Sequence, residues 1–501
     1  MRESLPRQNL WQARRVAVLG AGKSGRAAAA LLHAQGACVT VLDDAAREEA
    51  QARLAKLGGL PRDIRVHAGG IRSELLRGAE WIVRSPGIPL RHPACVWARE
   101  QGIPIVTEID VACAHLPDCT FIGVTGTNGK STTTCMLGRI FKSLRDSGRR
   151  DAMNRVSPEK KCPKMDSRRS LPLAPNRGGN DKESVRSLPS AQNDQENKGA
   201  LPLFVGGNLG TPLCEAVLAG ANPAWAVLEL SSFQLQNLRN LRLAAAIVTN
   251  IGVDHTREHG SHESYVRAKA RIVELLRPGG VLVCRPCDLE LLPSASLCAR
   301  GGTVWRVEEE CSIPLPGSIV WKHDRANAAM AASAAVALGV PPSVITTGLA
   351  AYRGLPHRFE PLGESRGVRF INDSKATNVG ATVAALKSVG RERVHLILGG
   401  QDKGESYKPL RDACGTGRVT VYAIGDEAAA IKRCLAREPP IPCVFAGMLA
   451  RAVDLAWRAA VPGETILLAP ACPSFDQFAN FAARGEAFRN LFQRLRADEQ
   501  A

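Results

Sequence analysis

The sequence predicts an α/β protein of three domains, each built on a mostly parallel, doubly wound sheet. A chain of 501 residues is longer than one compact domain, because domains commonly have about 100–200 residues. Short β-branched runs alternate with Ala- and Leu-rich helical stretches, which is typical of parallel sheets. Two of the strand-to-helix turns are rich in glycine, as phosphate-binding turns are.

The alternation falls into three groups, which we assign to residues 1–108, 109–354 and 355–501. In the first group a strand at 16–19 precedes a glycine turn, a helix at 26–35 and a strand at 39–42. Later strands are expected at 121–124, 226–228, 246–249, 281–284, 395–398, 419–424 and 465–468. Because each strand is followed by helical composition, the predicted sheets are parallel.

Residues 143–202 interrupt this pattern. The stretch has no Phe, Tyr or Trp, and its Lys and Arg number 13 against 8 Asp and Glu. Such a composition cannot bury enough apolar surface to offset the entropy lost on ordering. We therefore expect a flexible, tolerated insertion; an electrostatic contact with an anionic partner stays open as the alternative.

Composition limits the partners and the location. Lys and Arg total 65 against 48 Asp and Glu, a net charge of +17 that favours anionic partners. The charge is spread thinly rather than gathered in a basic stripe with aromatics, so we expect small phosphate-bearing ligands and no nucleic acid. We find neither a membrane-spanning apolar run nor a secretory signal. Fifteen cysteines show no disulfide spacing, so we expect a reduced, cytoplasmic protein with no membrane partner, and a monomer.

A glycine-rich turn follows the strand at 121–124 and opens a helix. Backbone N–H groups of such a loop surround phosphate oxygens, a lysine reaches the outer phosphates, and a hydroxyl can bind Mg²⁺. Val124 stands where a strict Walker A motif has glycine, so the loop is a variant form. The predicted ATP-binding residues of this turn are Gly123, Thr125, Gly126, Thr127, Asn128, Gly129, Lys130, Ser131 and Thr132.

A second glycine turn, Gly20-Ala-Gly22-Lys-Ser24-Gly25, follows the strand at 16–19, and Asp43 ends the next strand. This is the layout of a dinucleotide-binding turn. One such fingerprint does not choose between NAD and another nucleotide or nucleotide-sugar, and both remain open on the residues alone.

Three separate residues could complete a metal–phosphate site. Glu229 follows the strand at 226–228, where α/β proteins place their sites. His255 follows the strand at 246–249, and Lys269 lies in a predicted helix. Taken singly, each also has an ordinary interpretation as a surface acid, a capping residue and a solvated lysine.

In order after the phosphate loop, these residues and four later motifs form a recognisable set. The motifs are Gly354-Leu-Pro-His357-Arg358-Phe-Glu360, Phe370-Ile-Asn372-Asp373-Ser-Lys375-Ala-Thr377-Asn378, Leu398-Gly-Gly-Gln-Asp-Lys403-Gly404 and Ala471-Cys-Pro-Ser474-Phe475-Asp-Gln-Phe478-Ala-Asn-Phe481. The set resembles the Mur ligase family, ATP-dependent amide-forming enzymes of peptidoglycan synthesis. The resemblance covers nearly the whole chain apart from 143–202, and is greatest to the member that adds D-glutamate.

The resemblance implies a Rossmann-like N-terminal domain, a central P-loop domain and a Rossmann-like C-terminal domain that binds the amino acid. The implied substrates are ATP, UDP-N-acetylmuramoyl-L-alanine and D-glutamate. The implied cofactor is Mg²⁺, in two ions, together with a CO₂-derived carbamate on Lys269. The implied reaction passes through an acyl phosphate, and the charges it brings together must be neutralised by cations.

Carried over position by position, the resemblance also implies a role for each motif residue. The catalytic set is Lys130, Asn208, His255 and Lys269, and the metal ligands are Ser131, Glu229, His255 and carbamylated Lys269. Asn327, Arg358 and Asp373 join the phosphate loop in binding ATP, the last two only when the domains close. The UDP-linked substrate is assigned to Gly22, Ser24, Asp43, Ser85 and Gly87, and D-glutamate to Lys375, Thr377, Lys403, Ser474, Phe475 and Phe481.

Some positions depart from the family pattern. Arg257 stands where an acidic residue is usual, and Asp324 follows His323 where asparagine is usual, which bears on the adenine contact. Asp44 and Ala45 replace the basic residue expected after Asp43.

Three alternatives stay open at this stage: a related ligase for another amino acid or for folate, a P-loop switch or nucleic-acid-binding NTPase, and an inactive relative.

Overall fold

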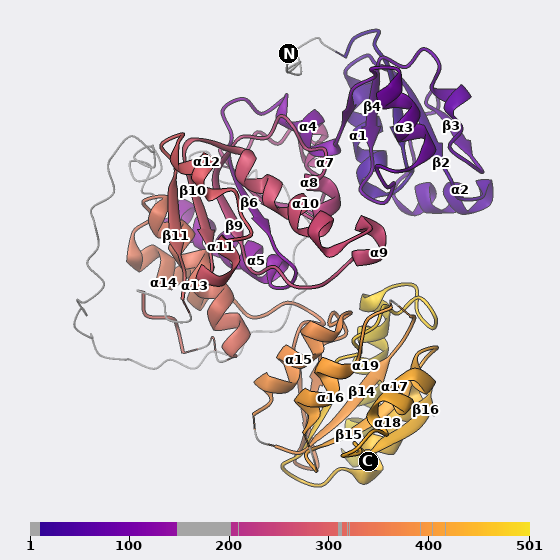
Figure 1. The fold of residues 1–501 in the computed structure, drawn as a ribbon, viewed down its shortest axis with the longest axis vertical. Coiled ribbons are helices and arrows are strands. Elements are labelled where there is room, and N and C mark those ends of the chain that lie inside the picture. Colours follow the sequence, from indigo (N-terminus) through magenta and orange to yellow (C-terminus); the bar gives the residue numbers. More distant parts are fainter. Residues whose placement is uncertain are drawn as a thin grey trace. The chain divides into compact units, whose positions relative to one another are not determined.

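The computed structural model describes residues 11–147, 202–208, 210–308, 313–317, 319, 321–390, 392–402, 404–415 and 417–500, without the side chains of Arg257 and Gln500. Nearly all of the predicted insertion at 143–202, and also Lys403, therefore lie outside the described residues. The described residues form three sheets with helices on their faces (Figure 1). The first two sheets belong to one compact unit and the third belongs to a second unit.

The first sheet has five parallel strands in the order β3-β2-β1-β4-β5. Its strands are β1 (Arg15–Leu19), β2 (Cys38–Asp43), β3 (Arg65–Ala68), β4 (Trp81–Arg84) and β5 (Ile105–Val106). Its helices are α1 (Lys23–Ala34), α2 (Arg47–Lys56), the short 3₁₀ helix η1 (Ser73–Leu76) and α3 (Pro93–Glu100), and α4 (Glu108–Cys113) leads to the next sheet. The strand order reverses between β1 and β4, which is where ligands bind in open α/β sheets.

The second sheet has six parallel strands in the order β11-β10-β9-β6-β8-β7. Its strands are β6 (Thr120–Thr125), β7 (Leu203–Gly207), β8 (Trp225–Glu229), β9 (Leu243–Val248), β10 (Leu276–Cys284) and β11 (Thr303–Arg306). Its helices are α5 (Lys130–Asp146), α7 (Leu213–Leu218), α8 (Ser232–Leu235), α9 (Thr256–His259), α10 (His262–Glu274), α11 (Pro286–Leu289), α12 (Ser294–Cys298), α13 (Lys322–Ala337) and α14 (Pro342–Ala350).

The third sheet has the order β12-β13-β17-β14-β15-β16, and only the β12–β13 pair is antiparallel. Its strands are β12 (Glu360–Ser365), β13 (Val368–Asn372), β14 (Val394–Gly399), β15 (Val419–Ile424), β16 (Cys443–Gly447) and β17 (Thr465–Leu468). Its helices are α15 (Val379–Ser388), α16 (Lys408–Cys414), α17 (Ala428–Leu435), α18 (Leu449–Ala459) and α19 (Phe481–Gln500).

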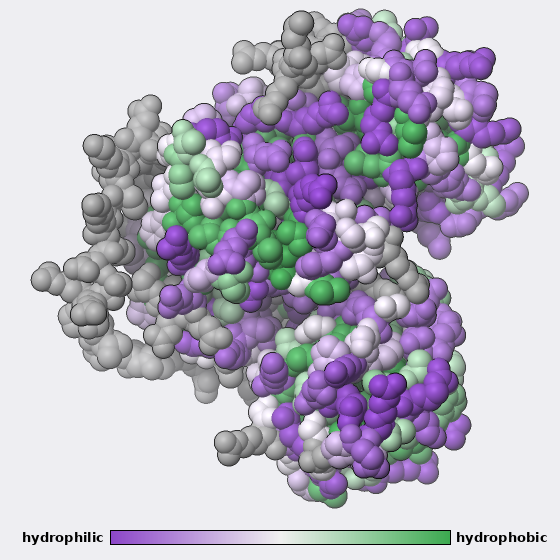
Figure 2. Space-filling model, viewed as in Figure 1, coloured by the Kyte–Doolittle hydropathy of each residue, from purple (hydrophilic) through white to green (hydrophobic). Residues whose placement is uncertain are grey.

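Apolar packing follows these sheets. One cluster of buried residues runs from the first sheet into the second, because helices α1, α4 and α7 pack against one another. Two further clusters cover the two faces of the third sheet. Hydrophilic residues dominate the face seen in Figure 2, while hydrophobic residues gather over part of the central sheet. In the described part of the chain, no helix has the length and apolar character needed to cross a membrane.

The predicted fold class is confirmed: the sheets are three, and all but one strand pair is parallel. Every strand expected from the sequence is present, with ends that match or differ by a few residues. The domain boundaries at 108/109 and 354/355 stay predictions.

Candidate active site

The predicted phosphate loop connects β6 to the N-terminus of α5. Gly126 and Gly129 have φ values of +148° and +82°, a region that side-chain-bearing residues rarely adopt. A Cβ at Gly126 would collide with the Thr249 hydroxyl, and one at Gly129 with the Asn327 amide oxygen. Both glycines are therefore required by conformation and by space, and predicted Asn327 lies directly against the loop.

The neighbouring strand β9 holds this loop in place. The Asn250 side chain accepts a hydrogen bond from Asn128 N (3.0 Å) and donates one to Asn128 O (2.8 Å), while Thr249 Oγ1 donates to the same carbonyl (2.5 Å). Thr249 and Asn250 were not predicted as site residues. Two polar residues directly after a buried strand that neighbours β6 would have been the signal, since carboxyl ends of parallel strands share one edge.

Two lysines from different helices converge on the loop. Lys130 Nζ donates to Gly126 O and Thr127 O, both at 2.9 Å, and Lys269 Nζ donates to Gly126 O at 2.7 Å. Lys269 is 2% exposed and lies over the Tyr265 ring, whose hydroxyl is 3.0 Å from Thr127 Oγ1. The interpretation of Lys269 as a solvated lysine on a helix face is therefore wrong.

Glu229 ends β8, the strand next to β6, and is also buried at 2% exposure. Its Oε1 accepts a hydrogen bond from predicted Asn208 (2.8 Å), whereas its Oε2 is buried without a hydrogen-bond partner among the described residues. Thr132 Oγ1 at the start of α5 is likewise buried and has no partner in the described chain. An unsatisfied carboxylate oxygen inside a protein is costly unless a cation or donor meets it. The surface-acid interpretation of Glu229 is wrong.

His255 lies at the start of α9 with a left-handed backbone (φ +51°). Its ring packs edge-on against Phe233 (5.2 Å between centroids), and its Nδ1 is 3.5 Å from Glu258 Oε1. His259 was not predicted; it stacks on Phe233 at 4.9 Å and hydrogen-bonds Ser232 and Gln236. The side chain of Arg257, where the family pattern has an acid, lies outside the described residues.

These residues have the chemistry that a magnesium site needs. Carboxylate, hydroxyl and carbonyl oxygens are the ligands that Mg²⁺ prefers, and the unpartnered Glu229 Oε2 is such an oxygen. Within the described ranges, no group of three or more His, Cys, Asp and Glu side chains is clustered as a metal site. Among the predicted ligands, Glu229 is the one carboxylate and His255 the one histidine. These residues fit Mg²⁺ only if hydroxyl, carbamate or substrate oxygens supply the remaining ligands.

The N-terminal glycine turn is built around Asp43. Its carboxylate accepts hydrogen bonds from Ala21 N (2.5 Å) and Ala45 N (2.9 Å) and pairs with Arg53 at 3.2 Å. Asp43 therefore shapes the turn in this structure.

Predicted Ser85 lies beside the same turn, because its hydroxyl donates to Gly20 O at 3.1 Å. A Cβ added at Gly22 or Gly87 would meet nothing within 4 Å, and Ser24 is half-buried. The two predicted substrate segments thus lie together, with open space at their glycines.

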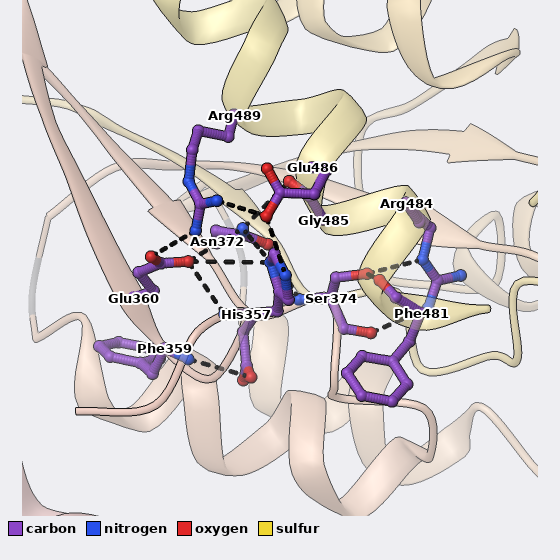
Figure 3. A network of polar contacts seen from close by, with 11 residues as sticks. His357, Phe359, Glu360, Asn372, Ser374, Phe481, Arg484, Gly485, Glu486 and Arg489 are labelled. Carbon is purple, nitrogen blue, oxygen red and sulfur yellow. Dashed lines mark hydrogen bonds and ion pairs between the residues drawn. The ribbon is translucent and has the colours of Figure 1, made fainter. Parts of the chain in front are cut away.

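In the third domain, the His357–Glu360 loop and the segment after β13 hold each other. His357 and Phe359 have left-handed backbones, with φ of +60° and +44°. Asn372 Nδ2 lies within 3.0–3.2 Å of His357 Nδ1, Glu360 Oε2 and Gly485 O, and Arg489 pairs with Glu360 (2.6 Å) and with Glu486 (Figure 3).

Arg358 and Asp373 lie in the two segments that this network joins. Phe359 N donates to Asp373 Oδ1 at 3.1 Å. Burial raises the pKa of Asp373 to about 7 and that of Asp324 to about 6, while the Arg358 guanidinium opposes both shifts. Burial lowers the pKa of His323 to about 4, so this histidine is neutral at pH 7.

Two of the predicted D-glutamate residues, Lys375 and Phe481, meet at the start of α19. Lys375 Nζ lies 4.0 Å from the centre of the Phe481 ring, and Thr377 follows two residues later. Ser474 Oγ is buried without a partner in the described chain, which fits a hydroxyl that meets a ligand, and Phe475 is 66% exposed. Lys403 lies outside the described residues.

Arg484 was not predicted as a site residue. It joins the segment after β13, at Ser374, to the segment after β17, at Cys472. It is 1% exposed, and it donates to Ser374 Oγ and O and to Cys472 O, each at 3.0 Å (Figure 3 shows the Ser374 contacts). A charged residue in a helical stretch usually marks a solvated face, so no sequence signal separated it from its neighbours.

Comparison with known proteins agrees with this geometry. Three domain families match the chain: Mur ligase MurD-like, N-terminal domain, at residues 14–107; Mur ligase middle domain, at 205–292; and Mur ligase, glutamate ligase domain, at 357–472. The chain is 36% identical to UDP-N-acetylmuramoylalanine–D-glutamate ligase of Anaeromyxobacter dehalogenans, covering 97% of this chain and 98% of the relative. It is 34% identical to the ligase of the same name from Koribacter versatilis, covering 97% and 99%.

Solved structures share the fold. MurF ligase from Thermotoga maritima in complex with ADP aligns with a TM-score of 0.52 at 15% identity, covering 97% of this chain and 96% of that one. UDP-N-acetylmuramate–alanine ligase from the same organism aligns with a TM-score of 0.51 at 17% identity, covering 96% and 99%. With relatives above 30% identity along nearly the whole chain and all three domains matched, the resemblance seen in the motifs is confirmed, and the chain belongs to the Mur ligase family.

Proposed function

We propose that the chain uses ATP to join D-glutamate to UDP-N-acetylmuramoyl-L-alanine in peptidoglycan precursor synthesis. The observation that carries this proposal is the 34–36% identity to ligases of that name along 97% of the chain. The phosphate loop, with two lysines and a buried unpartnered carboxylate oxygen beside it, supports the ATP half of the reaction.

In this proposal the substrate carboxylate attacks the γ-phosphoryl of ATP and forms an acyl phosphate with release of ADP. The amine of D-glutamate then attacks the acyl carbon, and phosphate leaves the tetrahedral intermediate. Lys130 and the N–H groups at the N-terminus of α5 neutralise the charge that develops on the transferring phosphoryl. The lysine is already held at the loop by Gly126 O and Thr127 O, so little reorganisation is needed.

In this proposal the residues that hold Mg²⁺ are Glu229, Ser131, His255 and Lys269. Bound there, the metal would neutralise phosphate charge and orient the oxygens of ATP. Asn208 donates a hydrogen bond to Glu229 Oε1, so in this proposal the unpartnered Oε2 is the oxygen that binds the cation.

We further propose that Lys269 works as a carbamate. Its side chain is buried at the loop beside Glu229's strand, and an ammonium next to a divalent cation would be repelled. A carbamate forms from the neutral amine, and burial favours the neutral form of an amine. The product is an oxygen ligand, which suits Mg²⁺.

The two remaining substrates occupy the outer domains in this proposal. The UDP end binds at the turns containing Gly22, Ser24, Asp43, Ser85 and Gly87. D-Glutamate binds among Lys375, Thr377, Lys403, Ser474, Phe475 and Phe481, and Asn327, Arg358 and Asp373 contribute to ATP binding. We place the enzyme in the cytoplasm as a monomer; the cysteines of the described residues are free thiols, as expected in a reducing compartment.

Phosphate release from ATP tests the proposal. Release should require both UDP-N-acetylmuramoyl-L-alanine and D-glutamate, and L-glutamate should not replace the D-isomer. Comparable activity with L-glutamate, L-alanine or a folate acceptor would assign the chain to another ligase, and phosphate release without any acceptor would indicate a simple NTPase.

A further inference from the structure

A buried arginine at the end of β4 joins the first sheet to the second. Arg84 is 1% exposed. On its own side it donates to Ile88 O, in the loop after β4; on the side of the second sheet it donates to Phe233 O in α8 (2.5 Å) and to Asn237 Oδ1 just after α8 (2.6 and 3.1 Å). One guanidinium therefore joins two segments 149 residues apart in the chain.

The acceptors of Arg84 are all neutral: two backbone carbonyls and one amide oxygen. In the described part of the chain no carboxylate pairs with it, and burial lowers the pKa of the guanidinium to about 10. A buried cation without an anion is costly. An apolar side chain of similar size would fill the space at lower cost, so the arginine is placed here for the geometry of its hydrogen bonds.

The segments that Arg84 joins lead to different parts of the candidate site. On one side, Ser85 is the next residue after Arg84, and the Ser85 hydroxyl donates a hydrogen bond to the glycine turn after β1. On the other side, Phe233 offers its carbonyl to Arg84 and its ring to His255 and His259. Tyr265 packs on His259 and reaches Thr127 of the phosphate loop.

We propose that Arg84 is a positioning residue that sets the distance between the turn for the UDP end of the substrate and the phosphate loop where the substrate's carboxylate reacts. This inference rests on the function proposed above. A substrate that spans both sheets is held at two ends, so its carboxylate meets the γ-phosphoryl only when the two sheets keep a fixed spacing. A small ligand that binds one sheet alone is insensitive to that spacing.

Variants of Asn237 test this without removing the arginine. Asn237→Leu removes the acceptor oxygen while keeping the branched shape of the side chain, and Asn237→Asp keeps the oxygen. Asn237 Nδ2 has no partner in the described chain, so the aspartate loses no existing bond. Arg84→Lys keeps the charge but cannot reach three acceptors at once. Arg271→Lys is the matched control, because Arg271 bonds Leu235 O (2.8 Å) and Leu238 O (3.1 Å) of the same segment, but from α10 of the second sheet.

The expected result is a selective loss. Asn237→Leu and Arg84→Lys should lower kcat/KM for UDP-N-acetylmuramoyl-L-alanine by about 10- to 100-fold, since an ångström of misplacement has effects of that size. Calorimetric affinities for UDP alone and for ADP alone should stay unchanged. Asn237→Asp and Arg271→Lys should behave like the wild type.

Two outcomes would overturn the inference: normal kcat/KM in Asn237→Leu, or an equal fall of UDP and ADP affinity, which would indicate a general loss of structure. Wild-type ligase activity in the same assay tests the proposed function separately. Hydrogen exchange gives an activity-independent readout. Amides at 85–88 and 233–237 should exchange faster in Asn237→Leu, with residues 126–130 unchanged, and unchanged exchange at the joint would also contradict the proposal.

Discussion

The two glycine turns of the molecule share one design and differ in the side chains that the neighbouring strand supplies. Each follows a buried parallel strand and opens a helix whose first residue is a lysine, Lys23 in α1 and Lys130 in α5. At the phosphate loop, β9 supplies a hydroxyl and an amide that hold the backbone, and two lysines lie at the loop. At the N-terminal turn, β2 supplies the carboxylate of Asp43, which takes the N–H of Ala21.

This difference decides what each turn can bind. A carboxylate that accepts a turn's N–H disfavours a phosphate at that N–H, whereas lysines attract one. The glycine pattern alone predicts only a close approach of ligand to backbone. The charge placed beside the pattern selects the ligand, and that charge comes from other elements: Asp43 from β2 at one turn and Lys269 from α10 at the other.

The two lysines that begin the helices give the largest expected contrast. Lys130→Ala should lower kcat by about 10²–10³-fold, because it removes a donor aimed at the transferring phosphoryl. Glu229→Ala should have an effect of the same order, because it removes the unpartnered carboxylate oxygen. Lys23→Ala should leave kcat nearly unchanged, because its Nζ bonds Gly210 O and not the phosphate loop. Steady-state phosphate release measures all three, and equal effects of the two lysine variants would remove the distinction.

The second lysine of the phosphate loop tests the carbamate. Lys269→Ala should abolish most activity and regain part of it with added short-chain carboxylates, which restore an oxygen ligand near Glu229. Arg267→Ala, which removes a positive charge on the same helix, should not respond to carboxylate. Full activity of Lys269→Ala without any additive would contradict the proposal.

Alanine at one glycine of each turn should separate conformational need from ligand contact. Gly126→Ala should raise KM for ATP strongly and lower the melting temperature, because its Cβ would collide with Thr249 at a φ of +148°. Gly22→Ala should leave the melting temperature unchanged, because a Cβ there meets nothing within 4 Å. Any effect of Gly22→Ala should appear only in KM for the UDP-linked substrate, and a destabilised Gly22→Ala variant would contradict this account.

Two buried acids of the second unit, Asp324 and Asp373, extend the comparison to pH. Asp43 accepts hydrogen bonds from two backbone N–H groups, whereas Asp324 and Asp373 both interact with the Arg358 guanidinium. Burial raises the folded-state pKa of Asp324 to about 6 from 3.8, so the folded protein binds its proton more tightly than the unfolded chain does. This group therefore lowers stability as pH rises from about 4 to 6.

Replacing that acid should reverse the effect. Asp324→Asn should raise the melting temperature by a few degrees at pH 7.5, corresponding to at most about 3 kcal/mol for a shift of two pKa units. At pH 4 the difference should be small. Asp412→Asn, at an exposed acid on α16 of the same unit, is the control and should show no such pH dependence. A constant difference across pH would exclude titration as its cause.

The smallest effect is expected from removing residues 149–200. All six described strands of the central sheet lie outside this stretch, and it contains no aromatic residue. We expect the shortened chain, closed by a short linker, to keep its kcat and its melting temperature. A large fall in melting temperature would show that the stretch contributes to a core.

Much of the fold and part of the site could be predicted from the sequence. The strands at 419–424 and 465–468 were predicted with their observed ends, because β-branched runs between helical stretches define them locally. The strand β5 was missed because a strand of two residues forms through pairing with a neighbour rather than through local preference, and the edge strand β16 was missed as well. Asn250 and Arg484 were missed for a similar reason: their partners lie far away in the chain.

The sequence by itself determined that this is a chain of parallel sheets with a phosphate-binding turn, since glycine positions and hydrophobic alternation are local properties. It also indicated the Mur ligase family, because the long motifs of that family can be recognised directly in the sequence. Only the tertiary structure decided that Lys269 is buried and bonded to Gly126 across 143 residues, that one oxygen of Glu229 has no partner, and that Arg84 joins two sheets. A helical pattern shows which residues share a face but not what that face meets. Burial, pairing and charge at a site depend on segments that meet only when the chain folds.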